Sequence, residues 1–236
     1  LRRNISSRRV VVTGMGLVTP LGVGVDHVWA QLTAGKSGIR QITKFDTSDL
    51  KAKIAGDVPR GDGAGEFNPD KFIEPKEQKK MDDFIHFVMA AADEAIKMSG
   101  IDLSTEEKRV RAGAMIGSGI GGLPAIEETV LMMKEKGPSR VSPFFIPACL
   151  INLASGQVSI KYGLKGPNHS VVTACSTGAH AIGDAAKIIA RGDADVMVAG
   201  SAEATICRIG MAGFAAARAL ATSYNETPEK ASRPWD

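Results

Sequence analysis

Residues 170–183 read Ser-Val-Val-Thr-Ala-Cys-Ser-Thr-Gly-Ala-His-Ala-Ile-Gly, and this stretch decides how the chain around it is interpreted. The β-branched pair at 171–172 is typical of the end of a buried strand. From 176 to 191 apolar residues recur at helical spacing, which predicts a helix. Cys175 is therefore expected where a strand turns into a helix, and backbone N–H groups and the helix dipole favour a thiolate there. A buried, inert cysteine is the commoner case in proteins, but this position favours a reactive one.

The composition narrows the class of protein. The chain has 236 residues, of which 44% are apolar, enough for one large domain or two small ones with a real core. A net charge of +3 and an aromatic content of 5% do not indicate nucleic-acid binding. No apolar run reaches the length of about 20 residues that a membrane span needs. Residues 1–7 lack the apolar core of a signal peptide.

The cysteines bear on the compartment. The three of them, Cys149, Cys175 and Cys207, are unevenly spaced and form neither a disulfide framework nor a metal motif. We therefore expect a reducing compartment, the cytoplasm, with an organelle matrix as the alternative. Cys149 and Cys207 are interpreted as packing residues.

Alternating strand and helix patterns predict a layered α/β fold with a mostly parallel sheet. Strands are expected at 9–15, 112–116, 170–174 and 195–199. Helices are expected at 27–34, 76–99, 125–136, 150–162 and 176–191. The polar segment 40–75 is rich in Gly, Asp and Pro, which predicts surface loops. No boundary is visible inside the chain, so residues 1–236 are interpreted as one domain.

Several motifs occur in the order in which a known enzyme family carries them. They are Arg-Val-Val-Val-Thr-Gly-Met-Gly at 9–16, Gly-Ser-Gly-Ile-Gly-Gly at 117–122, Ser-Pro-Phe-Phe-Ile-Pro at 142–147, Tyr-Gly-Leu-Lys-Gly-Pro at 162–167, Thr-Ala-Cys-Ser-Thr-Gly at 173–178, Gly-Asp-Ala-Asp-Val-Met-Val-Ala-Gly at 192–200 and Ala-Ser-Arg-Pro-Trp-Asp at 231–236. From about Arg8 onward the chain resembles the β-ketoacyl-acyl-carrier-protein synthases, most of all the type II condensing enzymes of fatty-acid synthesis.

The resemblance implies a thiolase fold, a five-layer α/β sandwich of two duplicated halves. This chain would supply the first half with its insertions. Members of the family continue beyond the motif at 231–236, where this chain stops. Two catalytic histidines and a catalytic lysine lie in that C-terminal half, so the chain alone is expected to be inactive.

The resemblance also implies the reaction and its residues. An acyl primer is held on Cys175 and condensed with malonyl-carrier protein, with loss of carbon dioxide, to give a 3-oxoacyl-carrier protein. Ile120 and Phe145 would border the acyl chain, and Phe144 or Phe145 would lie near the pocket of the partner in a homodimer. No metal or redox cofactor is implied, because the phosphopantetheine arm arrives on the carrier protein.

A basic cluster is the expected docking surface for that carrier. Lys76, Lys79 and Lys80 fall on one side of a predicted helix, and such a cluster is ordinarily a solvated face. By the resemblance, these three lysines and Arg218 match basic residues that meet the acidic acyl carrier protein, and steering by charge is physically sensible there.

Other functions remain open at this point. The run at 117–122 fits the dinucleotide pattern G-x-G-x-x-G after a strand, but the acidic residue expected about 20 positions later is missing; an NAD(P)-binding oxidoreductase is the remote alternative. A thiolase or a synthase using coenzyme A shares the fold and the nucleophile. A polyketide ketosynthase is the nearer alternative, and a non-catalytic partner subunit would lack Cys175. His180, five residues beyond Cys175, is expected to point away from the sulfur, and Glu203 has no readable role.

Overall fold

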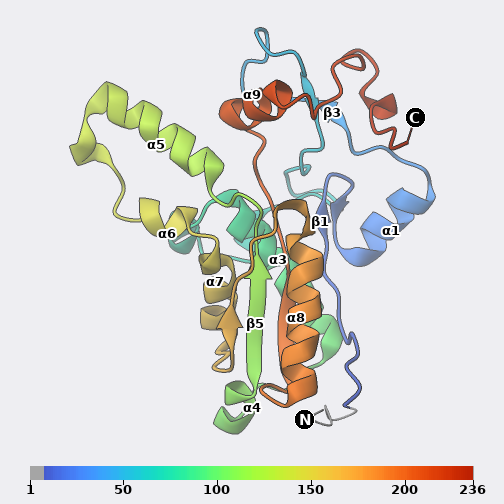
Figure 1. The fold of residues 1–236 in the computed structure, drawn as a ribbon, viewed down its shortest axis with the longest axis vertical. Helices are drawn as coiled ribbons and strands as arrows, with labels where there is room; N and C mark the ends of the chain where they lie inside the picture. Colours follow the sequence, from blue (N-terminus) through green and yellow to red (C-terminus); the bar gives the residue numbers. More distant parts are fainter. Residues whose placement is uncertain (1–7, 236) are drawn as a thin grey trace, which may run out of the picture.

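The computed structural model describes residues 8–235, and a three-stranded parallel sheet forms its centre (Figure 1). The sheet order is β6-β5-β7, where β5 is Ala112–Gly117, β6 is Asn168–His169 and β7 is Val196–Ser201. β5 pairs with β7 along all of its residues, and with β6 at only two positions. Two expectations fall wholly or partly outside the described residues. The signal-peptide expectation concerns residues 1–7, and the motif at 231–236 ends with Asp236.

Helices cover both faces of the sheet, as the layered α/β prediction requires. On one face, α8 (Thr177–Arg191) packs Ala181, Ala185 and Ile188 against Met115. On the other face, Ala112, Ala114 and Ile116 meet α3 (Asp83–Ser99) and α7 (Asn152–Tyr162). Because successive strand residues point to opposite faces, β5 serves two cores and is buried throughout.

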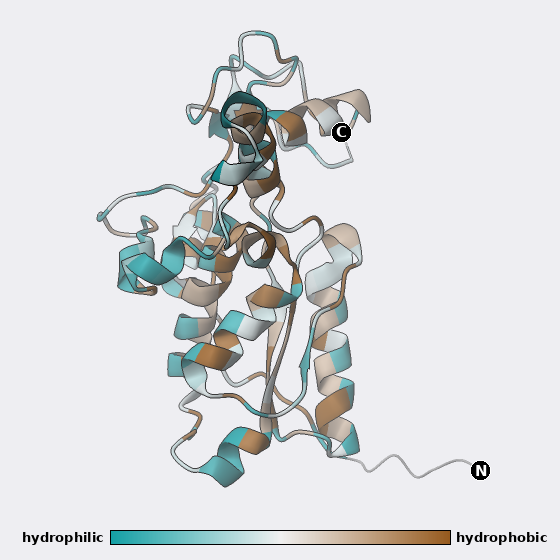
Figure 2. Ribbon diagram, turned by 90° about the vertical axis from the view of Figure 1, so that its left-hand side faces the viewer, coloured by the Kyte–Doolittle hydropathy of each residue, from teal (hydrophilic) through white to brown (hydrophobic). Residues whose placement is uncertain are grey.

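The remaining elements surround this centre. The helices are α1 (Val25–Thr33), α2 (Pro75–Gln78), α4 (Glu106–Val110), α5 (Leu123–Lys136), α6 (Phe145–Cys149) and α9 (Arg208–Ala216). Two short antiparallel ribbons join β1 (Val18–Thr19) to β2 (Gly22–Val23) and β3 (Arg40–Gln41) to β4 (Ile54–Ala55). In Figure 2 most helices carry both hydrophilic and hydrophobic segments, as helices that cover a sheet do.

The strand expected at 9–15 is wrong. This segment has no strand assignment, and Val11 and Val12 are 63% and 76% exposed. It lies on a helix instead: a Cβ on Gly14 would come 2.0 Å from the carbonyl oxygen of Ala95, and one on Gly16 1.8 Å from that of Ala91. The two glycines thus allow the backbone to press onto α3, where no neighbouring strand supplies hydrogen bonds.

The single helix expected at 76–99 is two helices. α2 ends at Gln78, and α3 begins after Asp82, whose backbone is extended. Apolar residues from Met81 onward are buried, among them Phe84, Ile85 and Val88. Short polar residues such as Asp82 favour helix starts over helix interiors, so the chain begins a new helix here. The lysine cluster therefore lies on a separate short helix and the link that follows it.

The strand expected at 170–174 is also misplaced. β6 ends at His169, and residues 170–173 have no strand assignment. Val171 nevertheless runs beside β5, since a Cβ on Gly117 would meet its carbonyl oxygen at 2.1 Å. The transition from sheet to helix is therefore kept, although the regular strand stops earlier.

Candidate active site

Cys175 lies at the turn between the sheet and α8. A single 3-10 turn, Ala174–Ser176, leads into the helix, and Cys175 is exposed within it. Ala174 has a φ of +52°, a left-handed conformation that costs a residue with a side chain about 1 kcal/mol or more. The turn is thus sharp and strained, and it presents the sulfur at the carboxyl end of the strands.

Thr177 holds this turn closed. Its hydroxyl accepts a hydrogen bond from Thr173 N at 2.9 Å and donates one to the carbonyl oxygen of Ala174 at 2.7 Å. The side chain is buried at 1% exposure. One side chain therefore satisfies backbone groups on both sides of the strained residue, a contribution that sequence reasoning did not identify.

The other two cysteines differ from Cys175 in environment. Cys207 is 6% exposed, and burial raises the pKa of its thiol to about 11. It directly precedes α9, a helix that the sequence did not predict. Burial, together with the charge of Asp82, also raises the pKa of the Cys149 thiol. Because the thiolate is the nucleophile, both are poorer nucleophiles than an ordinary cysteine.

The imidazole of His180 contacts residues other than Cys175, as expected from its helical position. Its Nδ1 lies 3.2 Å from Thr173 Oγ1, and its Nε2 lies 3.0 Å from Asp184 Oδ2. It therefore links the segment before the turn to the next turn of α8. No contact between His180 and Cys175 is described among residues 8–235.

The glycine run at 117–122 lies next to the turn of Cys175. A Cβ on Gly119 would come 3.2 Å from the carbonyl carbon of Ala174. On its other side the run meets α6, because a Cβ on Gly122 would come 2.6 Å from the Cα of Cys149. Ile120, at the tip, is 41% exposed. The structure thus places Ile120 between the turn of Cys175 and the helix that begins with Phe145.

A dinucleotide site at this run is disfavoured by charge. The run does join a strand, β5, to a helix, α5, and the backbone N–H groups there could bind a pyrophosphate. Glu203 already accepts hydrogen bonds from Ile120 N and Gly121 N, and Asp82 accepts one from Ala125 N at 2.9 Å. A second anion would meet two carboxyl groups of the protein itself.

The basic residues form one cluster and one separate position. Lys76 and Lys79 are exposed. Lys80 pairs with Glu77 at 2.7 Å and lies 5.6 Å from the ring centre of Phe144, so its charge is partly compensated. Arg218 follows α9 and is exposed, and none of the described contacts joins it to the three lysines.

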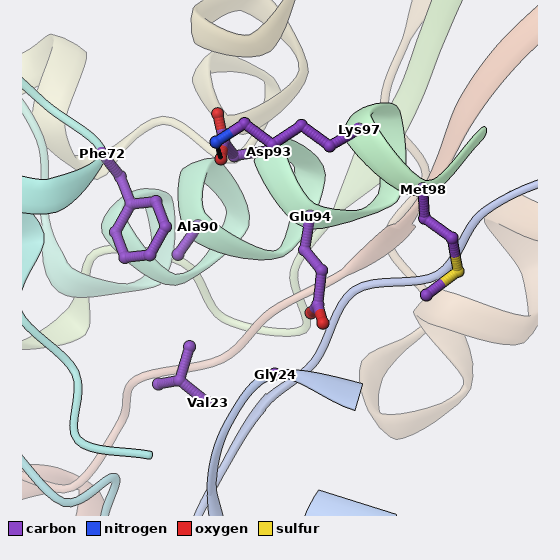
Figure 3. A pocket seen from close by; sticks show the side chains of 8 residues that line it. All are labelled: Val23, Gly24, Phe72, Ala90, Asp93, Glu94, Lys97 and Met98. Carbon is purple, nitrogen blue, oxygen red and sulfur yellow. Dashed lines mark ion pairs between the residues drawn. The ribbon is translucent and has the colours of Figure 1, made fainter. Parts of the chain in front are cut away.

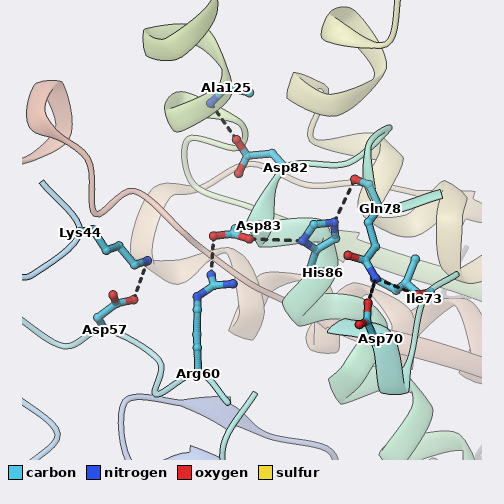
Figure 4. Close-up of polar contacts among 10 residues, drawn as sticks. All are labelled: Lys44, Asp57, Arg60, Asp70, Ile73, Gln78, Asp82, Asp83, His86 and Ala125. Atoms are coloured by element: carbon cyan, nitrogen blue, oxygen red, sulfur yellow. Dashed lines mark hydrogen bonds and ion pairs between the residues drawn. The ribbon is translucent and has the colours of Figure 1, made fainter. Parts of the chain in front are cut away.

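A polar network fixes the short helix that carries the lysines (Figure 4). The side-chain amide of Gln78 donates to Asp70 at 2.7 Å and to the carbonyl oxygen of Ile73 at 2.9 Å. The carbonyl oxygen of Gln78 lies 3.1 Å from Nε2 of His86, whose Nδ1 faces Asp83 of α3. The lysine cluster is therefore held at a defined place relative to α3.

Two surface hollows lie away from the nucleophile. One, of about 380 Å³, is lined by α3 and the residues just before α1; Figure 3 shows Lys97 paired with Asp93 there. The other, of about 430 Å³, lies along α8 near Asp184 and Lys187. Neither includes Cys175 or Ile120, so neither is taken as the acyl site.

Residues 8–235 contain no group of three or more His, Cys, Asp or Glu side chains placed to hold a metal ion. Within the same range no helix combines the length and the apolar character needed to cross a bilayer.

Comparison with known proteins gives one consistent result in sequence. The family model described as "Beta-ketoacyl synthase, N-terminal domain" matches residues 7–236. The 3-oxoacyl-[acyl-carrier-protein] synthase 2 of Rhizobium meliloti is 58% identical over 230 residues, 97% of this chain and 55% of that protein. The mitochondrial 3-oxoacyl-[acyl-carrier-protein] synthase of Arabidopsis thaliana is 47% identical over 98% of this chain and 52% of its own length. The chain thus spans about half the length of the curated relatives it matches.

Solved structures agree with this fold. A β-ketoacyl synthase from Burkholderia phymatum superposes with a TM-score of 0.80 at 28% identity, covering 97% of this chain and 54% of the other. A ketosynthase from a type II polyketide complex with its acyl-carrier protein gives a TM-score of 0.75 at 28% identity, covering 91% and 50%. The thiolase-like α/β class expected from the sequence is confirmed.

Proposed function

Because the chain belongs to the β-ketoacyl synthase family and matches its N-terminal domain, we propose that it forms the N-terminal half of a 3-oxoacyl-acyl-carrier-protein synthase of fatty-acid elongation. The observation that carries the proposal is the exposed Cys175 on a strained turn, next to the glycine run of Ile120. The names of the curated relatives, at 42–58% identity, support the same reaction.

In the proposed reaction Cys175 carries the growing chain. Its thiolate attacks the thioester carbonyl of the acyl-carrier primer, a new acyl–sulfur bond forms, and the bond to the pantetheine sulfur breaks, so that this sulfur leaves as a thiolate. Malonyl-carrier protein then loses carbon dioxide, and the resulting carbanion attacks the carbonyl carbon of the acyl-Cys175 thioester. The bond to Cys175 breaks, which releases the 3-oxoacyl-carrier protein and regenerates the thiolate. The covalent step divides one difficult reaction into two easier ones.

The backbone also has a part in this chemistry. The N–H of Cys175, on the turn before α8, would donate a hydrogen bond to the oxyanion that forms at the acyl carbonyl. The second donor, together with the two histidines and the lysine implied by the family resemblance, would come from a C-terminal half.

Exposed apolar surface supports a larger protein around this chain. Val11 and Val12 of the N-terminal segment and Ile182 of α8 are more than half exposed. Soluble proteins rarely leave such positions grouped and uncovered. In this proposal the C-terminal half packs over these residues, and residues 1–236 are one domain of an enzyme made of two halves.

We propose that the arm formed by α5 and α6 is the interface of a homodimer. This arm projects from the body of the molecule (Figure 1), and α5 has no buried residue. Its exposed apolar side chains are Ile126, Val130, Leu131, Met133, Phe144 and Ile146. Packing the arm against a second copy would cover them and bring Phe144 or Phe145 to the partner's acyl site.

Acyl carrier protein is the proposed partner, and charge reversal of the lysine cluster tests it. Lys79→Glu with Lys80→Glu is expected to raise KM for carrier-linked primer about tenfold at low salt, because carriers are acidic and rim charges govern encounter. The value of kcat is expected to stay within about twofold, since these residues do not touch Cys175. Steady-state kinetics at several salt concentrations give both values.

The matched control for the lysine cluster is Lys165→Glu. Lys165 pairs with Glu106 of α4, at the opposite end of β5 from Cys175. An unchanged KM in the cluster variant, or an equal rise in the control variant, would return Lys76, Lys79 and Lys80 to an ordinary solvated face.

The second candidate function is a polyketide ketosynthase. The solved polyketide ketosynthases share the fold and support this reading, but at 28–30% identity. The higher identity to the fatty-acid synthases favours elongation of fatty acids. The presence of Cys175 disfavours a non-catalytic partner subunit. The cytoplasm is the compartment we propose, supported by three cysteines that form no disulfide.

A condensation assay of the full-length protein tests the proposed function. With acyl-carrier primer and malonyl-carrier protein, we expect a 3-oxoacyl-carrier product and one carbon dioxide released for each product formed. No metal ion or nicotinamide is added. Absence of product with every straight-chain primer, but turnover with polyketide intermediates, would favour the second candidate.

A further inference from the structure

The carboxylate of Glu203 is bound by a single turn of the chain. Its Oε1 accepts hydrogen bonds from Ser118 Oγ at 2.9 Å and from Gly121 N at 3.3 Å. Its Oε2 accepts one from Ile120 N at 2.9 Å. Among residues 8–235 no other hydrogen bond or ion pair of Glu203 is described. All of its polar contacts therefore hold the turn at 118–121, although Glu203 lies more than 80 residues further along the chain.

This turn needs such support. Gly119 and Gly121 give its backbone wide conformational freedom, and Gly121 has a φ of +80°. The side chain at its tip, Ile120, is partly exposed and does not belong to any of the hydrophobic clusters. Hydrogen bonds that the turn donates to Glu203 thus replace the packing that would otherwise fix Ile120.

Glu203 and the residue before Cys175 both lie next to Gly119 of this turn. A Cβ on Gly119 would come 2.7 Å from Glu203 Oε2 and 3.2 Å from the carbonyl carbon of Ala174, the residue before Cys175. The backbone adds a link next to Glu203, where Ala202 N donates to the carbonyl oxygen of Gly117 at 3.3 Å. The turn that Glu203 binds is therefore next to the residue that precedes Cys175.

We propose that Glu203 is a positioning residue that sets the acyl-chain preference at Cys175 by holding Ile120 in place. The inference rests on the proposed function, because it presupposes an acyl chain that passes Ile120. A fixed isoleucine resists a long chain that must displace it, whereas a short chain ends before reaching it. When the turn is loosened, Ile120 can move aside. The acylation rate therefore rises for long primers and stays the same for short ones.

The substitution Glu203→Gln tests this. One carboxylate oxygen becomes an amide group that donates, so it faces a backbone N–H or the Ser118 hydroxyl as a second donor. We expect the ratio of the acylation rate constants for a long and a short primer to rise about tenfold, the factor that loss of a hydrogen bond to a charged group can produce. Acylation of Cys175 is followed by intact mass in the full-length protein, with carrier-bound primers of increasing length.

A second variant and a matched control separate positioning from stability. Ser118→Ala removes one donor to Glu203 and is expected to raise the same ratio, with less than additive effect in the double variant because the two residues share one network. Glu94→Gln is the control, since Glu94 also accepts two backbone hydrogen bonds, from Leu17 N at 3.0 Å and Val25 N at 2.7 Å. It lies on α3, and the ratio should not change.

The outcomes distinguish a failure of the role proposed for Glu203 from a failure of the proposed function. If Glu203→Gln slows all primer lengths by one factor, or every folded variant of Glu203 and Ser118 keeps the wild-type ratio, then Glu203 does not set chain preference. Should Glu203→Gln fail to fold, Ser118→Ala decides by the same ratio. If the unmodified protein accepts no acyl group on Cys175 from any primer, the proposed function itself is wrong.

Discussion

Replacing Cys175 by alanine is expected to reduce condensation by at least about 10³-fold, the scale of loss when a covalent nucleophile is removed. Alanine has no thiol, so the acyl group cannot leave the primer and the first half-reaction stops. The side chain is exposed and makes no described hydrogen bond, so the substitution should leave folding intact. The measurement is the rate of 3-oxoacyl-carrier formation at saturating primer, with a thermal unfolding curve of the same preparation.

The control for this variant is Cys207→Ala. It makes the same chemical change at a buried position that directly precedes α9, and it should lower the unfolding temperature while condensation persists. Condensation that survives Cys175→Ala, or that is lost instead on changing Cys207, would remove Cys175 from the mechanism.

Ile120→Phe is expected to slow acylation by long primers and to spare short ones. Ile120 is at the tip of the glycine run, in which Gly119 lies next to Ala174 and Gly122 lies next to Cys149 of α6. A phenyl ring at residue 120 would overpack the path of a chain that must pass it, at a cost of about 1–3 kcal/mol, or about 5- to 160-fold in rate. The cost should grow with chain length and be absent for primers that end before residue 120.

Acylation rate against primer length, for the wild type and the variant, is the measurement. Ile160→Phe serves as the control, because it is the same substitution at a position outside the site. Ile160 is exposed on α7. A uniform loss at every length in Ile120→Phe would mean that Ile120 supports the fold and does not gauge the chain.

Much of the fold follows from local pattern. The strands β5 and β7 and the helices α5, α7 and α8 lie within two residues of their expected positions. The strand β5 and the helices α7 and α8 each bury a run or stripe of residues that the local pattern already shows, whereas α5 buries none. The segment 9–15 has the same apolar pattern, but a strand also needs a neighbour to pair with. Within the described residues it lies on α3, and the valines at 11 and 12 stay exposed. Pattern alone cannot supply the partner.

The site was predictable to the same extent. Cys175 could be singled out because its signal, a strand followed by a helix, is contained in about 20 consecutive residues. The role of Thr177 has a weaker local signal, a hydroxyl two residues after the nucleophile at the start of a helix. Glu203 has none, because its partners, Ser118, Ile120 and Gly121, become neighbours only when β5 and β7 pair in parallel. Such contacts between distant segments require the folded structure.

The most direct test of the account is where the acyl group goes. Full-length protein is incubated with acyl-carrier primer in the absence of malonyl-carrier protein, digested, and its cysteine peptides are analysed by mass spectrometry. The account predicts an acyl thioester on Cys175, and none on Cys149 or Cys207, whose thiols are held protonated by burial. An acyl group found preferentially on either of those two residues, or on no cysteine at all, would contradict it.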